Sequence, residues 1–446
     1  MVAVWLGCMA VVSGLICLIN PHSLIGYYYY FALWLGFMVL FDRRQAKWFV
    51  SAYLITAVLA ALYVLVQVHY YPQSYGCTSP LGAQTDDSFF FSLVADSIPP
   101  GMETRDGYYL YSYGFSSIVR WITPFYVAHP LDVLFFLSGV AGLVCVYARQ
   151  LTIQLTSNRH AGRTAYVLSL FCPMMLMNGG AVFVRDTMVG ALLVLSLCCI
   201  FRRRYLAFGI CVAMQFVLRP GTAVMILALY GFMFAENLGS LLRTRKARLR
   251  VGLAVVILGV AGSWVLYSKQ EQLMQLFQDN GVSVTDLRRE GQSEILAAGF
   301  GKGAFAAIQQ QVLPLRVLLS LVYMYLAPFL NPNGMVTPDA FDCRILLMNV
   351  VYPIWAVPIH AGAVAALFPK DPRLRKPLRK WLLMLLVACF FIGVFSLQIR
   401  HRVIIQPLFY VLAAAGFYLG STRGKVIGFC LAGLWIVFQL AYLVLF

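Results

Sequence analysis

Long apolar runs separated by short polar turns recur along the whole chain. A run of about 17 or more apolar residues can cross roughly 30 Å of hydrocarbon as an α-helix, which pairs its own backbone polar groups. The expected spans are Val2–Ile19, Leu24–Phe41, Trp48–Val68, Leu131–Tyr147, Ala165–Asn178, Thr187–Phe201, Tyr205–Leu218, Ala223–Phe234, Val251–Tyr267, Ile345–Phe368, Trp381–Leu397, Val403–Leu419 and Val426–Phe446. The pattern predicts an all-α, polytopic transmembrane helical bundle of about 12–14 membrane helices, as one integral-membrane domain over residues 1–446.

Composition supports a bilayer location. The chain is 61% hydrophobic and 11% charged, whereas soluble domains carry about 25% charged residues. The first run lacks a preceding basic segment and a small-residue cleavage site, so we expect a retained helix rather than a signal peptide. A soluble fold is excluded on these grounds.

The net charge of +17 would suggest nucleic acid as a partner of a soluble protein, but here the basic residues gather in short loops between apolar runs. Such loops face the cytoplasm in membrane proteins. The six clusters are Arg43, Arg44 and Lys47; Arg149, Arg159 and Arg163; Arg202, Arg203 and Arg204; Arg243, Arg245, Lys246, Arg248 and Arg250; Lys370, Arg373, Arg375, Lys376, Arg379 and Lys380; and Arg423 and Lys425. The pattern predicts a cytoplasmic N-terminus, a multi-pass topology and no nucleic-acid partner.

Two long segments then fall on the extracytoplasmic face, residues 69–130 and 268–344. The second contains the apolar run Leu313–Leu330, which would place the richest basic loop outside if it crossed the bilayer. We therefore expect it to be re-entrant or to lie at the interface, in keeping with its Pro314, Arg316 and Pro328.

The first outer loop carries the sequence TDDSFFFSLVADSI, in which Asp86 and Asp87 precede Phe91 and Ala95 at helical spacing. The spacing predicts a short interfacial helix that begins near Asp87. A carboxylate at a helix start can simply cap the helix. Two adjacent carboxylates beside an apolar helix can also supply a general base with a raised pKa.

Further charges occur at the outer ends of two short apolar stretches. Arg185 and Asp186 lie between runs that are too short for a full span, so Arg185 is expected at membrane depth, with Asp186 as a local ion-pair partner. Arg219 lies in VLRPG, on the face where few cations are expected. Structural pairing and a functional role both remain open for these residues.

A late sequence, QIRHRVIIQPLFYVLAAAG, places Arg400, His401 and Arg402 before Pro407 at the outer start of a helix. Snorkelling of Arg400 and Arg402 to lipid headgroups is the alternative to a functional role. Carboxylates and arginines from four distant stretches are thus expected at one outer surface, where guanidinium groups bind phosphate oxygens and a carboxylate accepts a hydroxyl proton.

These residues resemble the GT-C superfamily of membrane glycosyltransferases and the related EpsG-like and Wzy-like polymerases of bacterial surface polysaccharides. The likeness rests on the acidic pair with Phe91 and Ala95, on the Arg185–Asp186 pair and on the late basic, proline and small-residue pattern. Phe91 replaces the usual tyrosine, Asp86–Asp87 stands where many relatives have Asp-Glu, and Arg400–His401 replaces the basic-aromatic pair.

The resemblance implies transfer of a sugar or glycan from a polyprenyl-phosphate or polyprenyl-diphosphate donor to a glycan or lipid-linked acceptor, on the outer side of the bacterial inner membrane. Asp87 would be the general base, with Asp86 as its helper. The carrier phosphate would be held by Arg185, Arg219, Arg400 and Arg402, with Asp186 and His401 in support.

A divalent cation beside Asp86 and Asp87 is an alternative, but two adjacent carboxylates form an incomplete site for it, so no cofactor is expected. The main rival is a transporter or flippase of a lipid-linked or anionic glycan, which would bind phosphate through arginines without needing a base. A scaffold subunit of a polysaccharide export complex is a third reading.

Overall fold

A computed structural model describes residues 2–70, 109–177, 182–241, 313–326, 346–395 and 399–445, with Phe91, Val94, Leu330 and the short strands 336–337 and 340–341. The described chain is helical apart from one two-stranded hairpin. It divides into two compact units, one of Met1–Leu227 with Leu321–Leu445, and one of Ala228–Ser320 with Phe446. The residues discussed below belong to the first unit.

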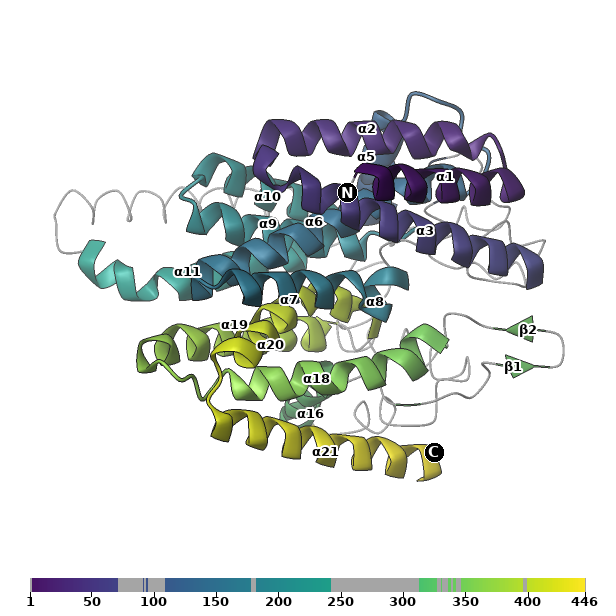
Figure 1. Cartoon of the computed structure of the whole chain (residues 1–446). Coiled ribbons are helices and arrows are strands. Elements are labelled where there is room, and N and C mark those ends of the chain that lie inside the picture. Colours follow the sequence, from purple (N-terminus) through teal and green to yellow (C-terminus); the bar gives the residue numbers. More distant parts are fainter. Residues whose placement is uncertain are drawn as a thin grey trace, which may run out of the picture. The chain divides into compact units, whose positions relative to one another are not determined.

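The described residues in the first half of the chain are mainly helical (Figure 1). They are α1 (Val2–Ile19), α2 (Ser23–Asp42), the 3-10 turn η1 (Arg43–Gln45), α3 (Ala46–Tyr70), α5 (Tyr109–Ile122), α6 (Leu131–Thr156), α7 (Arg159–Leu170), α8 (Pro173–Leu176), α9 (Asp186–Phe201), α10 (Tyr205–Leu218) and α11 (Pro220–Leu241).

The described residues in the second half of the chain are also mainly helical. It consists of α16 (Leu313–Leu326), the strands β1 (Val336–Thr337) and β2 (Ala340–Phe341), the π-helical segment η5 (Leu346–Val351), α18 (Tyr352–Ala365), the 3-10 turn η6 (Pro372–Leu374), α19 (Arg375–Phe395), the 3-10 segment η7 (Ile399–Ile404), α20 (Gln406–Leu419) and α21 (Thr422–Leu445). The strands pair antiparallel, with Val336 opposite Phe341.

Four helical stretches are long and apolar enough to cross a membrane: Ser23–Val66, which contains α2 and α3, Leu131–Thr156, Leu346–Ala365 and Thr422–Ala441. These stretches indicate a multi-pass membrane protein. The expected bounds of α1 and α10 agree with the structure, those of α2 differ by one residue at each end, and those of α9 differ by one residue at the start. The expected span Val251–Tyr267 lies outside the described residues.

Helix α6 is the central element, because its apolar window is buried along its full length and it contacts α2, α3, α7, α9 and α20. Small residues make this packing possible. Gly139 leaves room for the Trp34 indole of α2, and Gly142 for the Phe49 ring of α3. The core of the first unit therefore forms around α6.

One expected span, Ala165–Asn178, is wrong. The chain instead forms α7 from Arg159 to Leu170 and breaks before α8 begins at Pro173. Cys172 has an extended backbone, as expected for a residue before proline, and proline cannot continue the hydrogen-bond ladder of α7. Asn158 caps the start of α7 by accepting from the backbone N–H groups of His160 and Ala161.

A second difference concerns the end of α6, which we expected at Tyr147 and which lies at Thr156. The helix continues past Arg149 because that side chain has partners. Its Nη1 atom donates to Gln45 Oε1 at 2.8 Å, and its guanidinium lies 4.5 Å from the centre of the Trp48 ring. Partners of this kind let a cation lie within a helix near the membrane surface.

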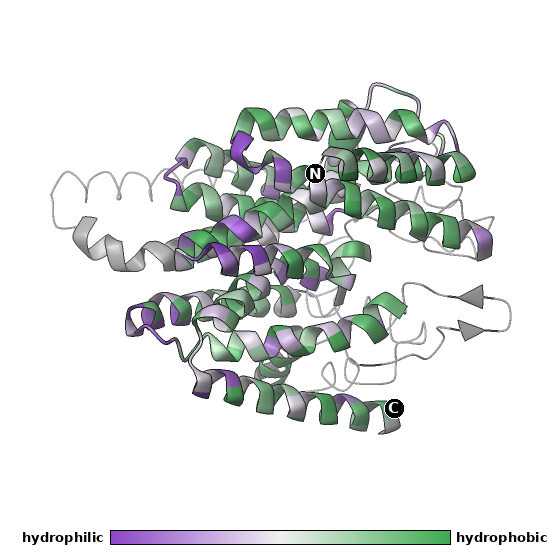
Figure 2. Ribbon diagram, in the orientation of Figure 1, coloured by the Kyte–Doolittle hydropathy of each residue, from purple (hydrophilic) through white to green (hydrophobic). Residues whose placement is uncertain are grey.

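The described basic clusters gather at one end of the bundle, here called the basic end. Arg202 pairs with Asp42 and Arg149 with Gln45, which joins the turns before α3 and α10 to the end of α6. Figure 2 shows hydrophilic residues at these turns. Trp5 Nε1 donates to Ser51 Oγ near the start of α3, so the N-terminal half of α1 packs toward the same end.

Helix α16 covers most of the run Leu313–Leu330 and is 14 residues long. A helix of this length rises roughly 21 Å, which is less than the hydrocarbon thickness. Whether this run is re-entrant or interfacial stays a prediction.

Helix α18 is held closely against α20 and α21 by small residues. Gly362 faces the backbone of Ala413 and Gly416 in α20, and Gly428 of α21 faces the backbone of Ala361. A side chain at any of these glycines would meet backbone atoms of the neighbouring helix. Close backbone approach through small residues is a common way for membrane helices to pack.

Candidate functional site

The candidate site begins at the N-terminus of α9, at the end of this helix that lies opposite the basic end. Asp186 is its first residue and is 3% exposed. A carboxylate here complements the partial positive charge of the helix N-terminus. Gly190, one turn further on, lies against Val403 and Ile404, which places the start of α9 beside η7.

Arg219 follows the last residue of α10 and reaches Asp186. Because Pro220 comes next, Arg219 is disfavoured from the helical region and has an extended backbone. Its N–H donates to Gln215 O at 2.7 Å, and Thr222 Oγ1 donates to its carbonyl at 2.7 Å. The break directs the guanidinium toward α9, where Nη1 lies 2.7 Å from Asp186 Oδ1.

His401 joins this pair from a segment 182 residues away from Arg219 in the sequence. Its ring nitrogens lie 3.1 Å from Arg219 Nη2, and its Nε2 lies 3.9 Å from Asp186 Oδ1. Three of the four predicted stretches therefore meet: the start of α9, the break after α10 and η7.

Arg402 is the next residue of η7 and is fully buried. Its Nε, Nη1 and Nη2 atoms have no hydrogen-bond acceptor among the described residues. The guanidinium carbon lies 4.7 Å from the centre of the Phe409 ring and 5.5 Å from that of Tyr352. This burial excludes the snorkelling alternative for Arg402. A buried cation without an acceptor costs several kcal/mol.

Gln406 and Tyr352 belong to the same surroundings and were not predicted. Tyr352 donates its hydroxyl hydrogen to Gln406 Oε1 at 2.9 Å, while Gln406 Nε2 has no acceptor among the described residues. Gln406 is completely buried. The sequence did contain a signal for Gln406. This polar amide comes directly before Pro407 and the apolar run of α20, where no hydrogen-bond partner is evident.

Arg185 precedes α9, and its Nη1 donates to Leu218 O at 3.3 Å. Asp186 forms an ion pair with Arg219, 33 residues away, and the expected local pair of Asp186 with Arg185 stays a prediction. Arg185, Asp186, Arg219, His401 and Arg402 are called the arginine cluster below. Within it, the guanidinium of Arg219 and the imidazole of His401 lie beside the Asp186 carboxylate, Arg185 precedes this acid in the chain, and Arg402 follows His401.

Most of the other predicted site residues belong to the first outer loop, residues 69–130. Asp86, Asp87 and Ala95 lie outside the described residues. Phe91 is helical, and Arg400 lies in η7 by its backbone alone. In the described part of the chain, no group of three or more His, Cys, Asp or Glu residues could hold a metal ion.

A different buried acid, Asp132, shows what a structural carboxylate looks like here. Its Oδ2 accepts from the N–H groups of Ala128 and His129 at 2.9 and 2.8 Å, and its Oδ1 accepts from Ser23 Oγ. Every one of these partners is a neutral donor that fixes the start of α6. The arginine cluster differs because its cations outnumber its acid.

No family model, curated protein or solved structure matches this chain. The resemblance to membrane glycosyltransferases therefore rests on the residues themselves. Guanidinium groups such as those of the arginine cluster form charge-assisted hydrogen bonds to phosphate and carboxylate oxygens.

Proposed function

We propose that this protein is an integral-membrane glycosyltransferase of the GT-C type, or a repeat-unit polymerase, that uses a polyprenyl-phosphate- or polyprenyl-diphosphate-linked sugar donor. It would act on the extracytoplasmic face of a bacterial inner membrane in cell-surface polysaccharide biosynthesis. The observation that carries this proposal is the buried guanidinium of Arg402, whose N–H groups have no acceptor among the described residues and which follows His401 of the Asp186–Arg219–His401 group in the chain.

An anionic group is the ligand that this arrangement favours. Arg402 presents up to five N–H donors and Gln406 Nε2 two more, and a phosphate offers several acceptor oxygens. Fixed donors in a site that excludes water stabilise a developing negative charge far better than they would in water. A carrier phosphate that leaves with its electron pair develops such a charge.

In the proposed reaction, the acceptor hydroxyl attacks the anomeric carbon of the donor sugar while the bond from that carbon to the phosphate oxygen breaks. Asp87 takes the hydroxyl proton, with Asp86 as its helper. Arg402, Arg219, Arg185 and Arg400 hold the phosphate, and Asp186 and His401 orient Arg219. Removal of one stabilising donor in such sites slows reactions by about 10²–10³-fold.

The test is complementation of cells that lack this protein, with the surface glycan profile as readout. Arg402→Met and Asp87→Asn are expected to leave the glycan shortened or missing when they reach the membrane at wild-type levels. Arg204→Met is the matched control, because Arg204 is an exposed arginine of the basic end. Restoration of the glycan by both site variants would overturn the proposal.

A transporter of a lipid-linked or anionic glycan would also need arginines, but not a base. An Asp86→Asn, Asp87→Asn double variant distinguishes the two. An enzyme variant would keep binding the lipid-linked donor and lose transfer, whereas a transporter variant would keep its activity.

A further inference from the structure

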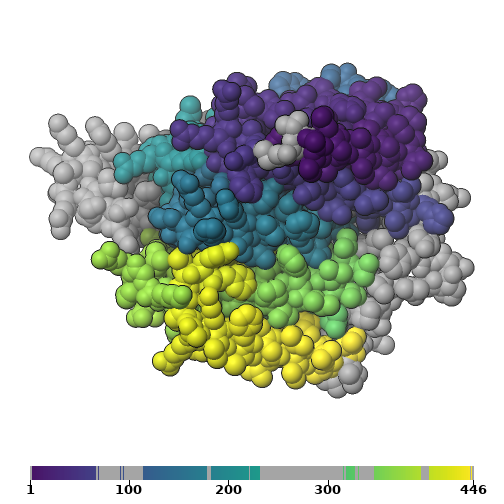
Figure 3. All heavy atoms as spheres, in the orientation of Figure 1, coloured from purple at the N-terminus to yellow at the C-terminus, as the bar shows by residue number. Residues whose placement is uncertain are grey.

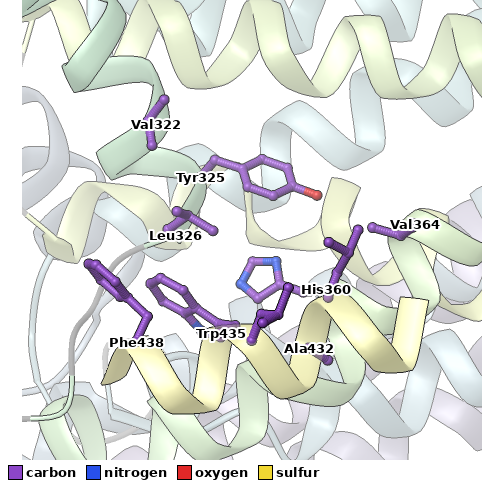
Figure 4. A pocket seen from close by; sticks show the side chains of 10 residues that line it. Val322, Tyr325, Leu326, His360, Val364, Ala432, Trp435 and Phe438 are labelled. Carbon is purple, nitrogen blue, oxygen red and sulfur yellow. The ribbon is translucent and has the colours of Figure 1, made fainter. Parts of the chain in front are cut away.

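A pocket of about 490 Å³ lies between α16, α18 and α21, within the range of small-molecule sites (Figure 4). Its walls are almost entirely apolar and aromatic. They are formed by Val322, Tyr325, Leu326, His360, Val364, Leu431, Ala432, Leu434, Trp435 and Phe438.

The pocket arises from a change in residue size along α18 and α21. The two helices approach closely where Gly428 faces the backbone of Ala361. Two turns further along α21, Trp435 and Phe438 stack at 5.3 Å between ring centres, and their bulk replaces the glycine contact. Space remains between these rings and α16.

His360 is a polar group of this pocket with two ring nitrogens that have no hydrogen-bond partner among the described residues. The residue is 6% exposed. Figure 4 shows its ring between Trp435 and Tyr325. A neutral imidazole offers one N–H donor and one acceptor, and leaving both unmade in an apolar site is costly.

The aromatic ring of Phe409 lies beside both His360 of this pocket and the guanidinium of Arg402. The Phe409 ring lies 6.2 Å from the His360 ring and 4.7 Å from the Arg402 guanidinium carbon. A phosphate in the pocket would lose its water and meet no lysine or arginine among the residues that line the pocket. An apolar chain that carries one neutral oxygen acceptor suits this pocket. The oxygen would accept a hydrogen bond from the imidazole, and the chain would contact the apolar walls.

The pocket is open along an apolar rim. Leu434 is 65% exposed and Phe438 49% exposed. Figure 3 shows α21 (yellow) on a face of the molecule. In a membrane-spanning protein such a rim faces lipid, so an occupant enters sideways from the bilayer.

We propose that this pocket binds one acyl chain of a bilayer glycerolipid, with the ester carbonyl oxygen accepting a hydrogen bond from His360. This lipid site is separate from the arginine cluster and does not depend on the proposed glycosyltransferase activity. An isoprenoid chain carries no oxygen along its length and would leave the imidazole unpaired, so the carbonyl distinguishes the two lipids.

Native mass spectrometry of the purified full-length protein tests the proposal. The probes are a diester phosphatidylglycerol, its diether analogue with the same chains and headgroup but no carbonyl, and a polyprenyl phosphate. We expect about tenfold stronger retention of the diester than of the diether, as one hydrogen bond would give. Equal retention of diester and diether, or retention of polyprenyl phosphate alone, would overturn the proposal.

Two variants locate the bound lipid. His360→Phe keeps an aromatic ring of similar shape and should erase the preference for the diester, whereas His22→Phe, at an exposed histidine outside the pocket, should keep it. Ala432→Phe fills the pocket and should abolish retention of both lipids. A diester preference that survives in His360→Phe contradicts the assignment, and the wild-type comparison decides the matter if that variant does not fold.

Discussion

The two ends of α9 carry ion pairs of equal length that differ in their surroundings. At the basic end, Arg202 Nη1 lies 2.7 Å from Asp42 Oδ2, and at the opposite end Arg219 Nη1 lies 2.7 Å from Asp186 Oδ1. Arg202 and its neighbours reach the surface, whereas Asp186 lies beside His401 and the segment that holds the buried Arg402. The geometry of a salt bridge alone therefore does not reveal its role; the charges that surround it do.

The largest expected effect comes from Arg402→Met. Because the buried guanidinium has no acceptor among the described residues, we expect the substitution to stabilise the fold by about 1–3 kcal/mol. Transfer activity should fall about 10²–10³-fold at the same time. Thermal unfolding in detergent, together with the glycan profile, measures both changes. Lower stability with unchanged activity would mean that Arg402 is a structural residue with an acceptor.

Removal of the two carboxylates compares the ion pairs directly. Asp186→Asn should cost about 3 kcal/mol, because the Asp186 carboxylate is the more buried of the two acids and its removal leaves Arg219 beside His401. Asp42→Asn should cost about 1 kcal/mol, because Arg202 can turn to water at the surface. Denaturation of the purified variants measures both losses, and equal losses would remove the contrast between the two ends.

Two buried glutamines offer a milder comparison. Gln215 donates to Val189 O and accepts from Thr222 near the arginine cluster, while Gln45 accepts from Arg149 at the basic end. Gln215→Leu and Gln45→Leu should each cost about 1–2 kcal/mol. Only Gln215→Leu should also weaken transfer, through the backbone of Arg219. A parallel loss of activity in Gln45→Leu would indicate a general folding effect.

The smallest effect is expected at the Asp132 site, where a carboxylate is purely structural. Burial lowers the pKa of His129, and Asp132 opposes this shift in part. The folded state therefore binds a proton less readily than the unfolded state, so stability should fall as the pH drops below about 6.5. His129→Asn should remove part of this dependence in thermal unfolding between pH 7 and 5. An unchanged pH profile would show that other groups control it.

Much of the helical pattern was predictable, because hydrophobic length and basic turns depend on nearby residues. The bounds of α1 and α10 follow from their apolar runs. The break before Pro173 was also readable, since proline excludes a continuous helix there. The partner of Asp186 was not, because a pair 33 residues apart depends on how α9 and α10 pack.

The environment of Arg402 could not be predicted from the sequence either. From its sequence, an arginine at a helix start was as compatible with headgroup snorkelling as with burial, and only the packing of Tyr352 and Phe409 distinguishes them. The convergence of Arg219, Asp186 and His401 followed from placing their segments on one face by charge. The atomic contacts among these three residues could not be derived from that placement.

The glycine contacts of α18 help to fix the helices that surround Arg402. Gly416 in α20 meets the backbone of Gly362 in α18 so closely that neither helix can slide past the other without separating. Arg402 lies in the segment that leads into α20, and its ring neighbours Tyr352 and Phe409 belong to these same two helices. The guanidinium is therefore preorganised: an arriving anion would meet donors already in position, and little reorganisation free energy would be spent on binding.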